Sequence, residues 1–305
     1  MAKRIVVVGS SNTDMIIQMP RIPRPGETIL GGRFSMAAGG KGANQAVAAA
    51  RAGGAVTFVA RVGDDMFGKR AVEGFVADGI DVHHVIRDSE APSGVALIFV
   101  ADDGENSIGV ASGANARLSP ADVETARDAI ASADVLVMQL ETPLETVRAA
   151  AKIAADRGVR VILNPAPAQP LDDDLLRRVS ILTPNETEAE LLTGIRVDDE
   201  ATAGKAARAL LARGVQTVLI TLGARGAFLA APEGGLPVPG FKVEPVDTTA
   251  AGDVFNGALA VALSEGRSLK ESVRFANAAA ALSVTKLGAQ PSAPSRKEID
   301  AFLAK

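Results

Sequence analysis

The sequence predicts an α/β protein built around a mainly parallel β-sheet. Short apolar segments rich in β-branched residues alternate with amphipathic, alanine-rich segments of about 12 residues, which is the pattern of βαβ units. Several of the apolar segments contain no polar residue, as expected of strands that are covered on both faces. The chain has 305 residues, of which 47% are hydrophobic, enough for one large domain or a domain with a subdomain.

The expected elements follow from this alternation in chain order. The strand candidates are residues 5–8, 56–60, 135–140, 159–163, 179–182 and 215–221. The helix candidates are residues 43–52, 120–131, 143–157, 186–192, 201–213, 254–265, 269–284 and a last helix from 296. Ser119 followed by Pro120 is typical of a helix start, and the pair Gly53 and Gly54 is typical of a helix end.

Two segments interrupt the alternation and predict a small antiparallel sheet outside the main one. Residues 14–36 and 93–112 combine strand-like alternation with turn residues and contain no helical pattern. Such a sheet would expose one apolar face, formed by residues such as Ile16, Leu97, Ile98 and Phe99. An exposed apolar face needs a cover. We therefore expect a lid over a site that also forms a dimer contact.

Composition excludes several classes of function. Without cysteine the chain cannot form disulfides, a thiolate nucleophile or a cysteine metal site. The net charge of −4, with both signs interspersed, and the absence of Trp and Tyr make nucleic-acid binding unexpected. The first ten residues contain too few apolar positions for a signal peptide, and no apolar run is long enough for a membrane helix, so we expect a cytoplasmic protein.

The segment VDTTAAGDVFNGALAVAL, residues 246–263, carries the most information about chemistry. Small residues lead into a helix, whose first backbone N–H groups and positive dipole end together form an anion site. Ala250, Ala251 and Gly252 are small enough for their amides to approach a phosphate, and Asp253 lies beside them. Taken alone, Asp253 could simply cap the helix.

The segment AAGGKGANQAVAAA, residues 37–50, is a glycine-rich turn before a helix. Gly40 permits a tight turn, Lys41 supplies a mobile positive charge, and Asn44 faces the same opening from the helix. The spacing matches neither the P-loop nor the dinucleotide-binding fingerprint. In isolation such a turn is more often structural.

Polar residues follow two of the predicted strands at their carboxyl ends, where open α/β sheets bind ligands. Asn12 and Asp14 are two residues apart, so strand alternation places both on one face, where a carboxamide and a carboxylate suit adjacent sugar hydroxyls. Glu141 ends the strand predicted at 135–140. The alternative interpretation of the Asn12 and Asp14 pair is an Asx turn.

TPNETEAELLTG, residues 183–194, places Asn185 and Glu188 on one face of a helix. The pair could form a capping box, or it could bind phosphates and a magnesium-bound water, and both roles are compatible. TLGARGAFLA, residues 221–230, predicts a strand, a glycine turn and a second strand. It suits a nucleotide-contacting loop but could equally be a hairpin.

Taken together and in this order, these segments resemble the PfkB family of carbohydrate kinases. The resemblance extends from GSSNTD to QPSAP and is specific at GGKGANQA, NPAPA, TPNETEAE and DTTAAGDVFNGAL. It implies a single domain over residues 1–305, a three-layer α/β/α fold with a β-sheet lid, and a homodimer in which two lids clasp each other.

The resemblance also implies the roles of individual residues. Asp253 corresponds to the catalytic base, and the amides of Ala250, Ala251, Gly252 and Asp253 correspond to the anion hole. The implied sugar-site residues are Asn12, Asp14, Gly40, Lys41, Asn44, Glu141 and Asp253, and the implied nucleotide-site residues are Asn185, Thr221, Gly223, Gly226, Gly252 and Asn277. Glu188 corresponds to the magnesium residue. The implied monovalent-cation (K⁺) loop comprises Asp247, Thr249, Ser283, Lys286, Gly288 and Ser292, acting mostly through carbonyl oxygens.

The expected reaction is in-line transfer of the ATP γ-phosphate to the primary 5-hydroxyl of ribose, with Asp253 taking the proton and Mg²⁺ bridging phosphates. One alternative is a kinase for 2-deoxyribose or for another small sugar or nucleoside. A more distant alternative is a non-catalytic sugar-binding protein, because fold alone does not decide function.

Overall fold

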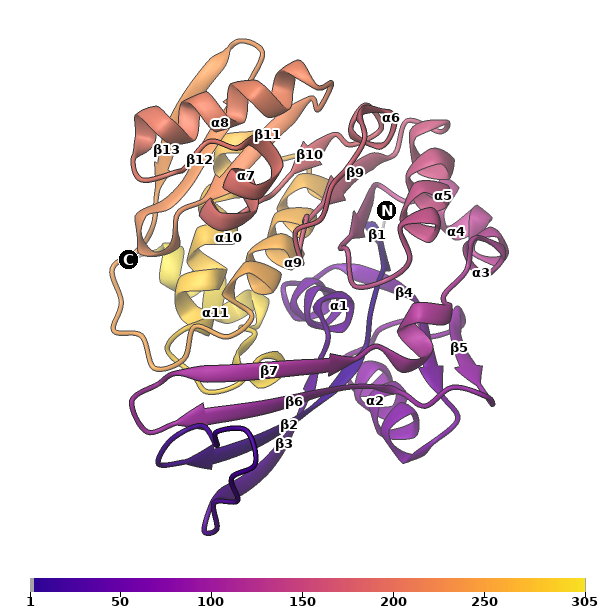
Figure 1. Cartoon of the computed structure of the whole chain (residues 1–305). Helices are drawn as coiled ribbons and strands as arrows, with labels where there is room; N and C mark the ends of the chain where they lie inside the picture. The colour runs from indigo at the N-terminus through magenta and orange to yellow at the C-terminus, as the bar shows by residue number, and fades with distance from the viewer. Residues whose placement is uncertain (1–2, 305) are drawn as a thin grey trace.

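A nine-stranded sheet forms the centre of the molecule, a computed structural model that describes residues 3–304 (Figure 1). The strand order is β13-β12-β11-β10-β9-β8-β1-β4-β5. Their bounds are β1 Arg4–Val8, β4 Ala55–Gly63, β5 Val85–Asp88, β8 Val135–Met138, β9 Arg160–Leu163, β10 Ile181–Leu182, β11 Thr217–Thr221, β12 Gly226–Ala231 and β13 Gly234–Pro239. Neighbours from β11 to β5 pair in parallel, and β12 and β13 add an antiparallel edge. The predicted mainly parallel sheet is confirmed.

Helices cover both faces of this sheet, which confirms the three-layer fold. One layer contains α1 Lys41–Arg51, α2 Met66–Ala77, α9 Ala251–Ser264, α10 Leu269–Ser283 and α11 Arg296–Leu303. The other contains α3 Pro120–Thr125, α4 Arg127–Ala131, α5 Leu144–Ala155, α6 Asp173–Leu176, α7 Glu186–Thr193 and α8 Glu200–Ala212. In β1, Ile5 and Val7 pack against the first layer while Val6 and Val8 pack against the second. The strand is therefore apolar throughout because each face meets its own core.

Local signals placed most helices within one to three residues; the short helix α6 was not predicted, and two further elements differ. The helix predicted at 120–131 is divided at Ala126, whose N–H bonds to Val123 O instead of continuing the α-helical pattern. Helix α2 was not predicted, although Asp65 caps it by accepting from the Phe67 and Gly68 amides. No helix within residues 3–304 is long and apolar enough to cross a membrane.

A second, four-stranded sheet projects from the body as a lid (Figure 1). Its strands, in the order β3-β2-β6-β7, are β2 Asn12–Met19, β3 Arg33–Gly39, β6 Gly94–Ala101 and β7 Asn106–Ala111. The prediction of an antiparallel lid is wrong at its centre, because β2 and β6 pair in parallel. Both strands leave the body in the outward direction, and β3 and β7 return, so the two central neighbours must be parallel.

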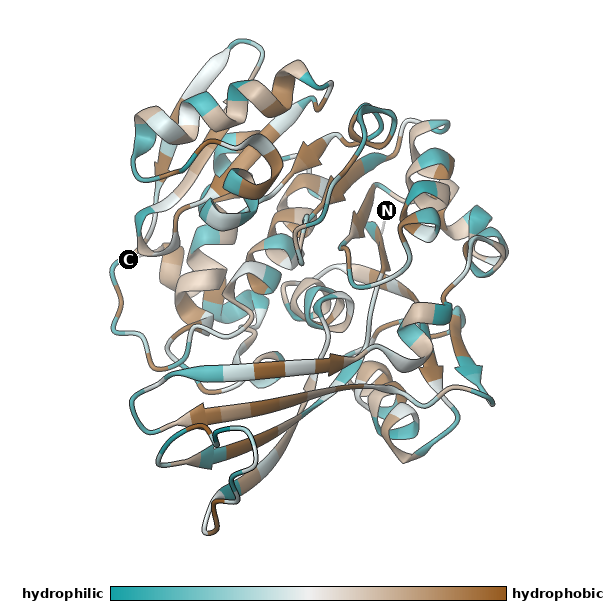
Figure 2. Cartoon of the chain, in the orientation of Figure 1, coloured by the Kyte–Doolittle hydropathy of each residue, from teal (hydrophilic) through white to brown (hydrophobic). Residues whose placement is uncertain are grey.

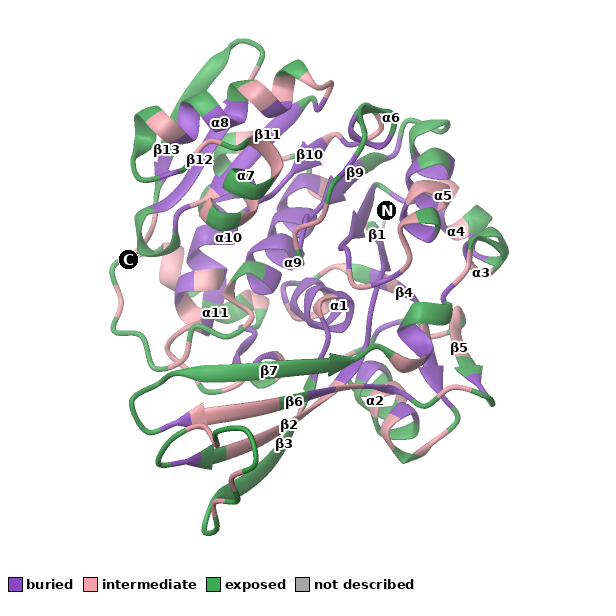
Figure 3. Ribbon diagram, in the orientation of Figure 1, coloured by how far each residue is buried: buried purple, intermediate pink, exposed green. Residues whose placement is uncertain are grey.

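Both faces of the lid carry apolar side chains, whereas the sequence predicted one apolar face. Alternation along the paired strands places Ile16 and Ile98 on the face that carries Asp14, and places Leu97 and Phe99 on the opposite face. Figure 2 shows the hydrophobic residues along these strands, and Figure 3 shows that β7 is exposed while the central strands of the main sheet are buried. On the opposite face Phe34 is 61% exposed and Leu97 is 52% exposed.

Candidate active site

The amino end of α9 provides backbone donors for an anion. Ala250 precedes the helix in the left-handed conformation (φ 58°), the one non-glycine residue within 3–304 with a positive φ. No described side chain caps the helix. The Ala251 amide donates to Thr248 O (3.3 Å), but the amides of Gly252 and Asp253 have no described partner and are available to a ligand. A Cβ added at Gly252 would meet no described atom within 4 Å, so the space beside that amide is open. These features fit the predicted anion hole at Ala250 to Asp253.

Asp253 lies in the first turn of α9 and is buried, with 6% of its surface exposed. Its Oδ2 accepts a hydrogen bond from Asn44 Nδ2 (2.9 Å), and its Oδ1 accepts one from Gln45 Nε2 (2.9 Å). Burial raises the pKa of this carboxyl, while Lys41 and the two amide donors act in the opposite direction. The result is a desolvated, oriented carboxylate beside the free amides, which is the arrangement that a general base requires.

Gln45 belongs to a buried amide network that the sequence did not reveal. Its Nε2 also donates to Asn164 Oδ1 (3.1 Å), and its Oε1 accepts from Gln139 Nε2 (2.7 Å). Asn164 in turn donates to Thr183 O (3.1 Å). The network joins α1, α9 and the ends of three strands, so it holds the base relative to the sheet. The available signals were Gln45 in the GANQA segment and Asn164 in the NPAPA segment.

Close packing of α1 on α9 brings this network to Asp253. A Cβ at Gly257 would lie 2.7 Å from both Gln45 O and the Ala48 Cβ. No side chain fits between the helices at that point, so the glycine permits their close approach. Gly40 is the N-cap of α1 and has a positive φ (88°), and a Cβ there would lie 2.6 Å from Asn12 N.

The predicted sugar-site residues converge on one opening. Glu141 Oε2 accepts from the Lys41 backbone amide (3.0 Å) and from Ser10 Oγ (2.5 Å). Asn44 Oδ1 is buried and has no hydrogen-bond partner within residues 3–304. An orphaned acceptor beside a carboxylate base fits a ligand that brings its own hydroxyl groups.

Charges around the opening explain the titration of Asp14. Burial first, and then the carboxylates of Glu141 and Asp253, raise the pKa of Asp14 to about 6, while Lys41 opposes this. Burial lowers the pKa of Lys41, but Asp253, Glu141, Glu188 and Asp14 raise it by more, so the net shift is upward. The Lys41 ammonium therefore stays charged among four carboxylates, at the place where a phosphoryl group would add further negative charge.

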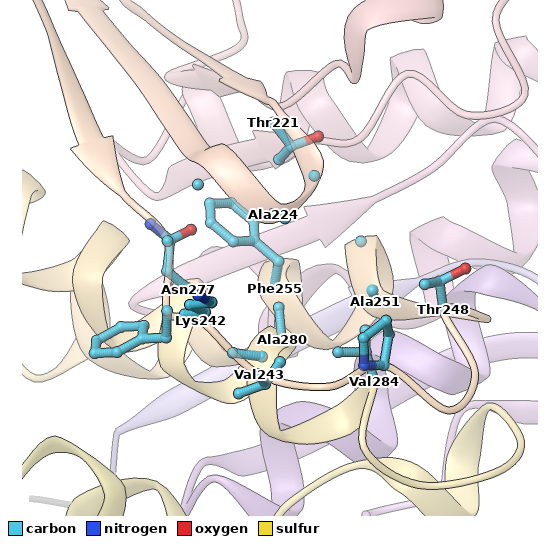
Figure 4. A pocket seen from close by; sticks show the side chains of 17 residues that line it. Thr221, Ala224, Lys242, Val243, Thr248, Ala251, Phe255, Asn277, Ala280 and Val284 are labelled. Atoms are coloured by element: carbon cyan, nitrogen blue, oxygen red, sulfur yellow. The ribbon is translucent and has the colours of Figure 1, made fainter.

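A cavity of about 450 Å³ lies on the other side of the α9 amino end (Figure 4). It includes the predicted nucleotide residues Thr221, Gly223, Gly226, Gly252 and Asn277. Its remaining lining is mostly apolar: Ala224, Gly240, Phe241, Lys242, Val243, Pro245, Thr248, Ala251, Phe255, Ala280, Ala281 and Val284. A mostly apolar cavity of this volume beside an anion site suits a purine nucleotide.

Asn277 and Asn185 both have structural partners at this cavity. Asn277 Nδ2 donates to Val238 O and Pro239 O (both 3.1 Å), so its amide also anchors the edge strand β13. Asn185 does not line the cavity but lies beside it, forming an isolated bridge with Thr221.

The capping-box interpretation of Asn185 and Glu188 is confirmed. Asn185 Oδ1 accepts from Glu188 N (2.8 Å), and Glu188 Oε2 accepts from Asn185 N (2.9 Å). Burial raises the pKa of Glu188, and among the nearby charges Lys41 lowers it and Asp253 raises it. This carboxylate therefore faces the same opening as Lys41 and Asp253. Residues 3–304 contain no group of three His, Cys, Asp or Glu suited to a metal. A single carboxylate fits Mg²⁺ bound mainly through phosphates and waters.

Two segments of the implied monovalent-cation loop lie side by side. Asp247 accepts from Thr249 N (2.9 Å) and Gly288 N (2.8 Å), and its own amide donates to Val284 O (3.1 Å). The Lys286 ammonium is turned away and pairs with Glu298 (2.8 Å). The hydroxyls of Ser283 and Ser292 donate to the backbone. The side chains therefore tie the loop together, and carbonyl oxygens are left as the available cation ligands.

A desolvated carboxylate between a sugar-sized polar opening and a nucleotide-sized cavity defines a phosphotransferase that acts on a small polyhydroxylated acceptor. Comparison with known proteins agrees with this class. The pfkB family of carbohydrate kinases matches residues 2–296, and the chain belongs to that family.

Similar proteins from several organisms align over nearly the whole chain. It is 51% identical over 303 residues to a ribokinase of Haemophilus influenzae, covering 99% of each chain. It is 38% identical over 301 residues to a deoxyribokinase of Salmonella typhi, covering 98% of each. A solved structure of Arabidopsis thaliana ribokinase complexed with ribose and ATP superimposes with a TM-score of 0.94 at 36% identity, covering 100% of both chains.

Proposed function

We propose that the protein phosphorylates D-ribose on its 5-hydroxyl with ATP, giving ribose 5-phosphate and ADP. The observation that carries this proposal is the position of Asp253, which is buried, held by two amide donors and adjacent to the uncapped amides of α9. The similarity to ribokinases, one of them solved with ribose and ATP, supports the choice of substrates.

The reaction follows from these positions. Asp253 takes the proton of the acceptor hydroxyl as the oxygen attacks the γ-phosphorus. A new O–P bond forms while the bond to the β-phosphate oxygen breaks, and ADP leaves. The amides at Ala250 to Asp253 hold the transferring group, and the Lys41 ammonium balances its charge. Glu188 would hold a nucleotide-bound Mg²⁺ through water, and the ion would supply neutralisation of phosphate charge.

The remaining sugar contacts use the polar residues of the opening. Asp14 and Glu141 can accept from the secondary hydroxyls, while Asn12 and Lys41 can donate to them. Asp14 belongs to the lid strand β2, so closing of the lid and binding of the sugar are coupled.

The face of the lid opposite to the one that carries Asp14 supports a homodimer. Phe34 and Leu97 project from it and are more than half exposed, and Met36 lies on the same face. Burying these side chains against a second lid would stabilise the dimer by about 25 cal/mol for each Å² of apolar surface removed from water. Sedimentation of Leu97→Asp against the wild type tests this, and a strict monomer for the wild type at assay concentrations would refute it.

A second candidate is a 2-deoxyribose kinase, which the similarity to a deoxyribokinase supports. The two substrates differ by one hydroxyl. A site built to bind that hydroxyl with Asp14 would discriminate strongly, because deoxyribose would leave a buried carboxylate oxygen unpaired.

Release of ADP, measured with ribose, 2-deoxyribose, fructose and adenosine as acceptors, tests the proposal. We expect ribose to give the highest kcat/KM and the product to carry phosphate on O5 by phosphorus NMR. Asp253→Asn, which removes the base, serves as the matched control for background ATP hydrolysis. Absence of product with every acceptor would favour a non-catalytic sugar-binding protein.

A further inference from the structure

Asn115 is a buried polar residue that no part of the reaction requires directly. It lies in the 3₁₀ helix Gly113–Arg117, directly after lid strand β7, and is 2% exposed. Its Oδ1 accepts from Ser11 N (2.8 Å), and its Nδ2 donates to Ser11 O (3.1 Å) and to Asn12 Oδ1 (2.8 Å). All the polar atoms of its amide are therefore used.

These bonds lie at the root of the lid. Strand β2 begins at Asn12, and strand β6 begins at Gly94, which pairs with Asn12. A Cβ at Gly94 would lie 2.2 Å from both Asn115 Nδ2 and Asn12 Oδ1. Because the backbone is in contact with this pair of amides, neither side chain can move aside without shifting the start of the lid.

The bonds also determine which way the Asn12 amide points. A backbone N–H can only donate, so the Asn115 atom that contacts Ser11 N must be the oxygen Oδ1. The Asn115 Nδ2 group must then face Asn12. Asn12 then presents Oδ1 to Asn115, and its own Nδ2 makes no hydrogen bond within residues 3–304. A cavity of about 390 Å³ is lined by Asn12, Asn115 and Glu141. The Asn12 amide therefore offers a donor to this cavity beside the Glu141 acceptor.

We propose that Asn115 is a positioning residue for sugar binding: it locks the Asn12 amide so that the NH₂ group, and not the oxygen, meets a hydroxyl of the acceptor. This proposal rests on the sugar-kinase function proposed above. The lock also joins the end of β7 to the start of β2, so the donor stays oriented as the lid moves.

Asn115→Asp separates this role from a purely structural one. The introduced carboxyl still accepts from Ser11 N. When the carboxyl is ionised, its other oxygen faces two further acceptors, Ser11 O and Asn12 Oδ1, and is repelled by them. The Asn12 amide then rotates, so that its NH₂ group bonds to the carboxylate and its oxygen faces the sugar. When protonated, that oxygen donates to Asn12 Oδ1, as Nδ2 did, and the original orientation returns.

Burial raises the pKa of the introduced carboxyl, and so do the carboxylates around it. Asp14 on β2 and Glu141 across the cavity contribute in this direction, as does Asp65, which binds Ser93 just before β6. Lys41 acts in the opposite direction, but its charge is shared among Asp14, Glu141, Glu188 and Asp253. The other cations on the packed elements are already paired, Arg61 on β4 with Asp88 and Asp122, and Arg117 with Asp88 and Glu90.

The experiment is calorimetric titration of ribose into each variant without nucleotide, because the chain has no Trp or Tyr to report binding. At pH 8 we expect Asn115→Asp and Asn115→Ala to raise the ribose Kd about tenfold or more, the effect of one lost hydrogen bond to a polar ligand. For Asn115→Asp, the ratio of its Kd to that of the wild type should fall toward one as the pH falls to 5.5. The ratio corrects for protonation of Asp14, which both proteins share.

Ser93→Ala is the matched control, because Ser93 binds Asp65 and the Gly63 amide at the same root of the lid without touching Asn12. It should leave the ribose Kd within about twofold. In an Asn12→Ala background, Asn115→Ala should have no further effect on the Kd. Equal effects of Ser93→Ala and Asn115→Ala, or a pH-independent ratio for Asn115→Asp, would overturn the proposal. A wild type that binds no ribose would instead refute the proposed function.

Discussion

Replacing Asp253 with asparagine should separate catalysis from stability. The carboxylate accepts one bond from Asn44 and one from Gln45, and the new NH₂ group would oppose one of these donors. Gln45 is held by Asn164 and Gln139, whereas Asn44 Oδ1 is buried without a described partner. Rotation of the Asn44 amide would therefore restore a hydrogen bond at little cost, and the variant should fold.

The substitution changes the free energy of unfolding in two ways, which have opposite signs. Two charge-assisted hydrogen bonds of about 1.5–3 kcal/mol each become neutral bonds of about 0.5–1.5 kcal/mol each. Against this loss, the variant no longer buries an ion, whose effective desolvation costs several kcal/mol. Because burial has the larger influence on Asp253, we expect the free energy of unfolding to stay equal or to rise by up to about 2 kcal/mol. Loss of the general base should lower kcat about 10²–10⁴-fold.

The assays are ADP release under saturating ribose and ATP, thermal unfolding by calorimetry, and ribose titration. Ribose binding should persist, weakened by no more than about tenfold, because rotation of Asn44 removes one acceptor from the site. Asp199→Asn is the control, since Asp199 caps α8 outside the site and asparagine caps equally well. Turnover of Asp253→Asn within tenfold of the wild type would refute the reasoning, and so would a clear loss of stability with intact ribose binding.

Three further predictions follow from the same geometry. Folding raises the pKa of Asp14 from 3.8 to about 6, so the folded state binds its proton more tightly, and the contribution of Asp14 to ligand-free stability should fall by about 2 kcal/mol as the pH rises from 4 to 6. Asp14→Asn should lack this fall and melt higher than the wild type at pH 7, while binding ribose poorly; a lower melting temperature there would contradict the assigned shift. Ala250→Gly should stabilise the fold by about 0.5–1 kcal/mol, because relief of a left-handed alanine (about 1–2 kcal/mol) exceeds the added chain entropy (about 0.4–1 kcal/mol). Calorimetry showing a destabilised Ala250→Gly would mean that the helix start is not strained. Gly40→Ala should cost at least about 2 kcal/mol, since its φ is positive and its Cβ would lie 2.6 Å from Asn12 N; an unchanged melting temperature would show that the backbone can yield there.

Local patterns in the chain were sufficient for the class of fold and for most elements. The two-sided apolar character of residues 5–8 predicted a covered strand, and Ser119 followed by Pro120 marked a helix start that the structure contains. These signals are readable because each depends on only a few neighbouring residues. The ordered set of motifs from GSSNTD to DTTAAGDVFNGAL carried the family, which the comparisons confirm.

Contacts between distant parts of the chain were not readable in the same way. Gln45 and Asp253 are 208 positions apart, and Asn115 and Asn12 are 103 apart, so nothing local indicates that they share hydrogen bonds. The parallel pairing of β2 with β6, and the division of Ile98 and Leu97 between two faces, likewise depend on where each strand leaves the body. Amphipathic periods and caps are properties of one segment, whereas the partner of a buried polar group is chosen by packing. The amino acids therefore specified which segments form and which chemistry they carry, and the folded arrangement specified how the base, the amides and the lid are held together.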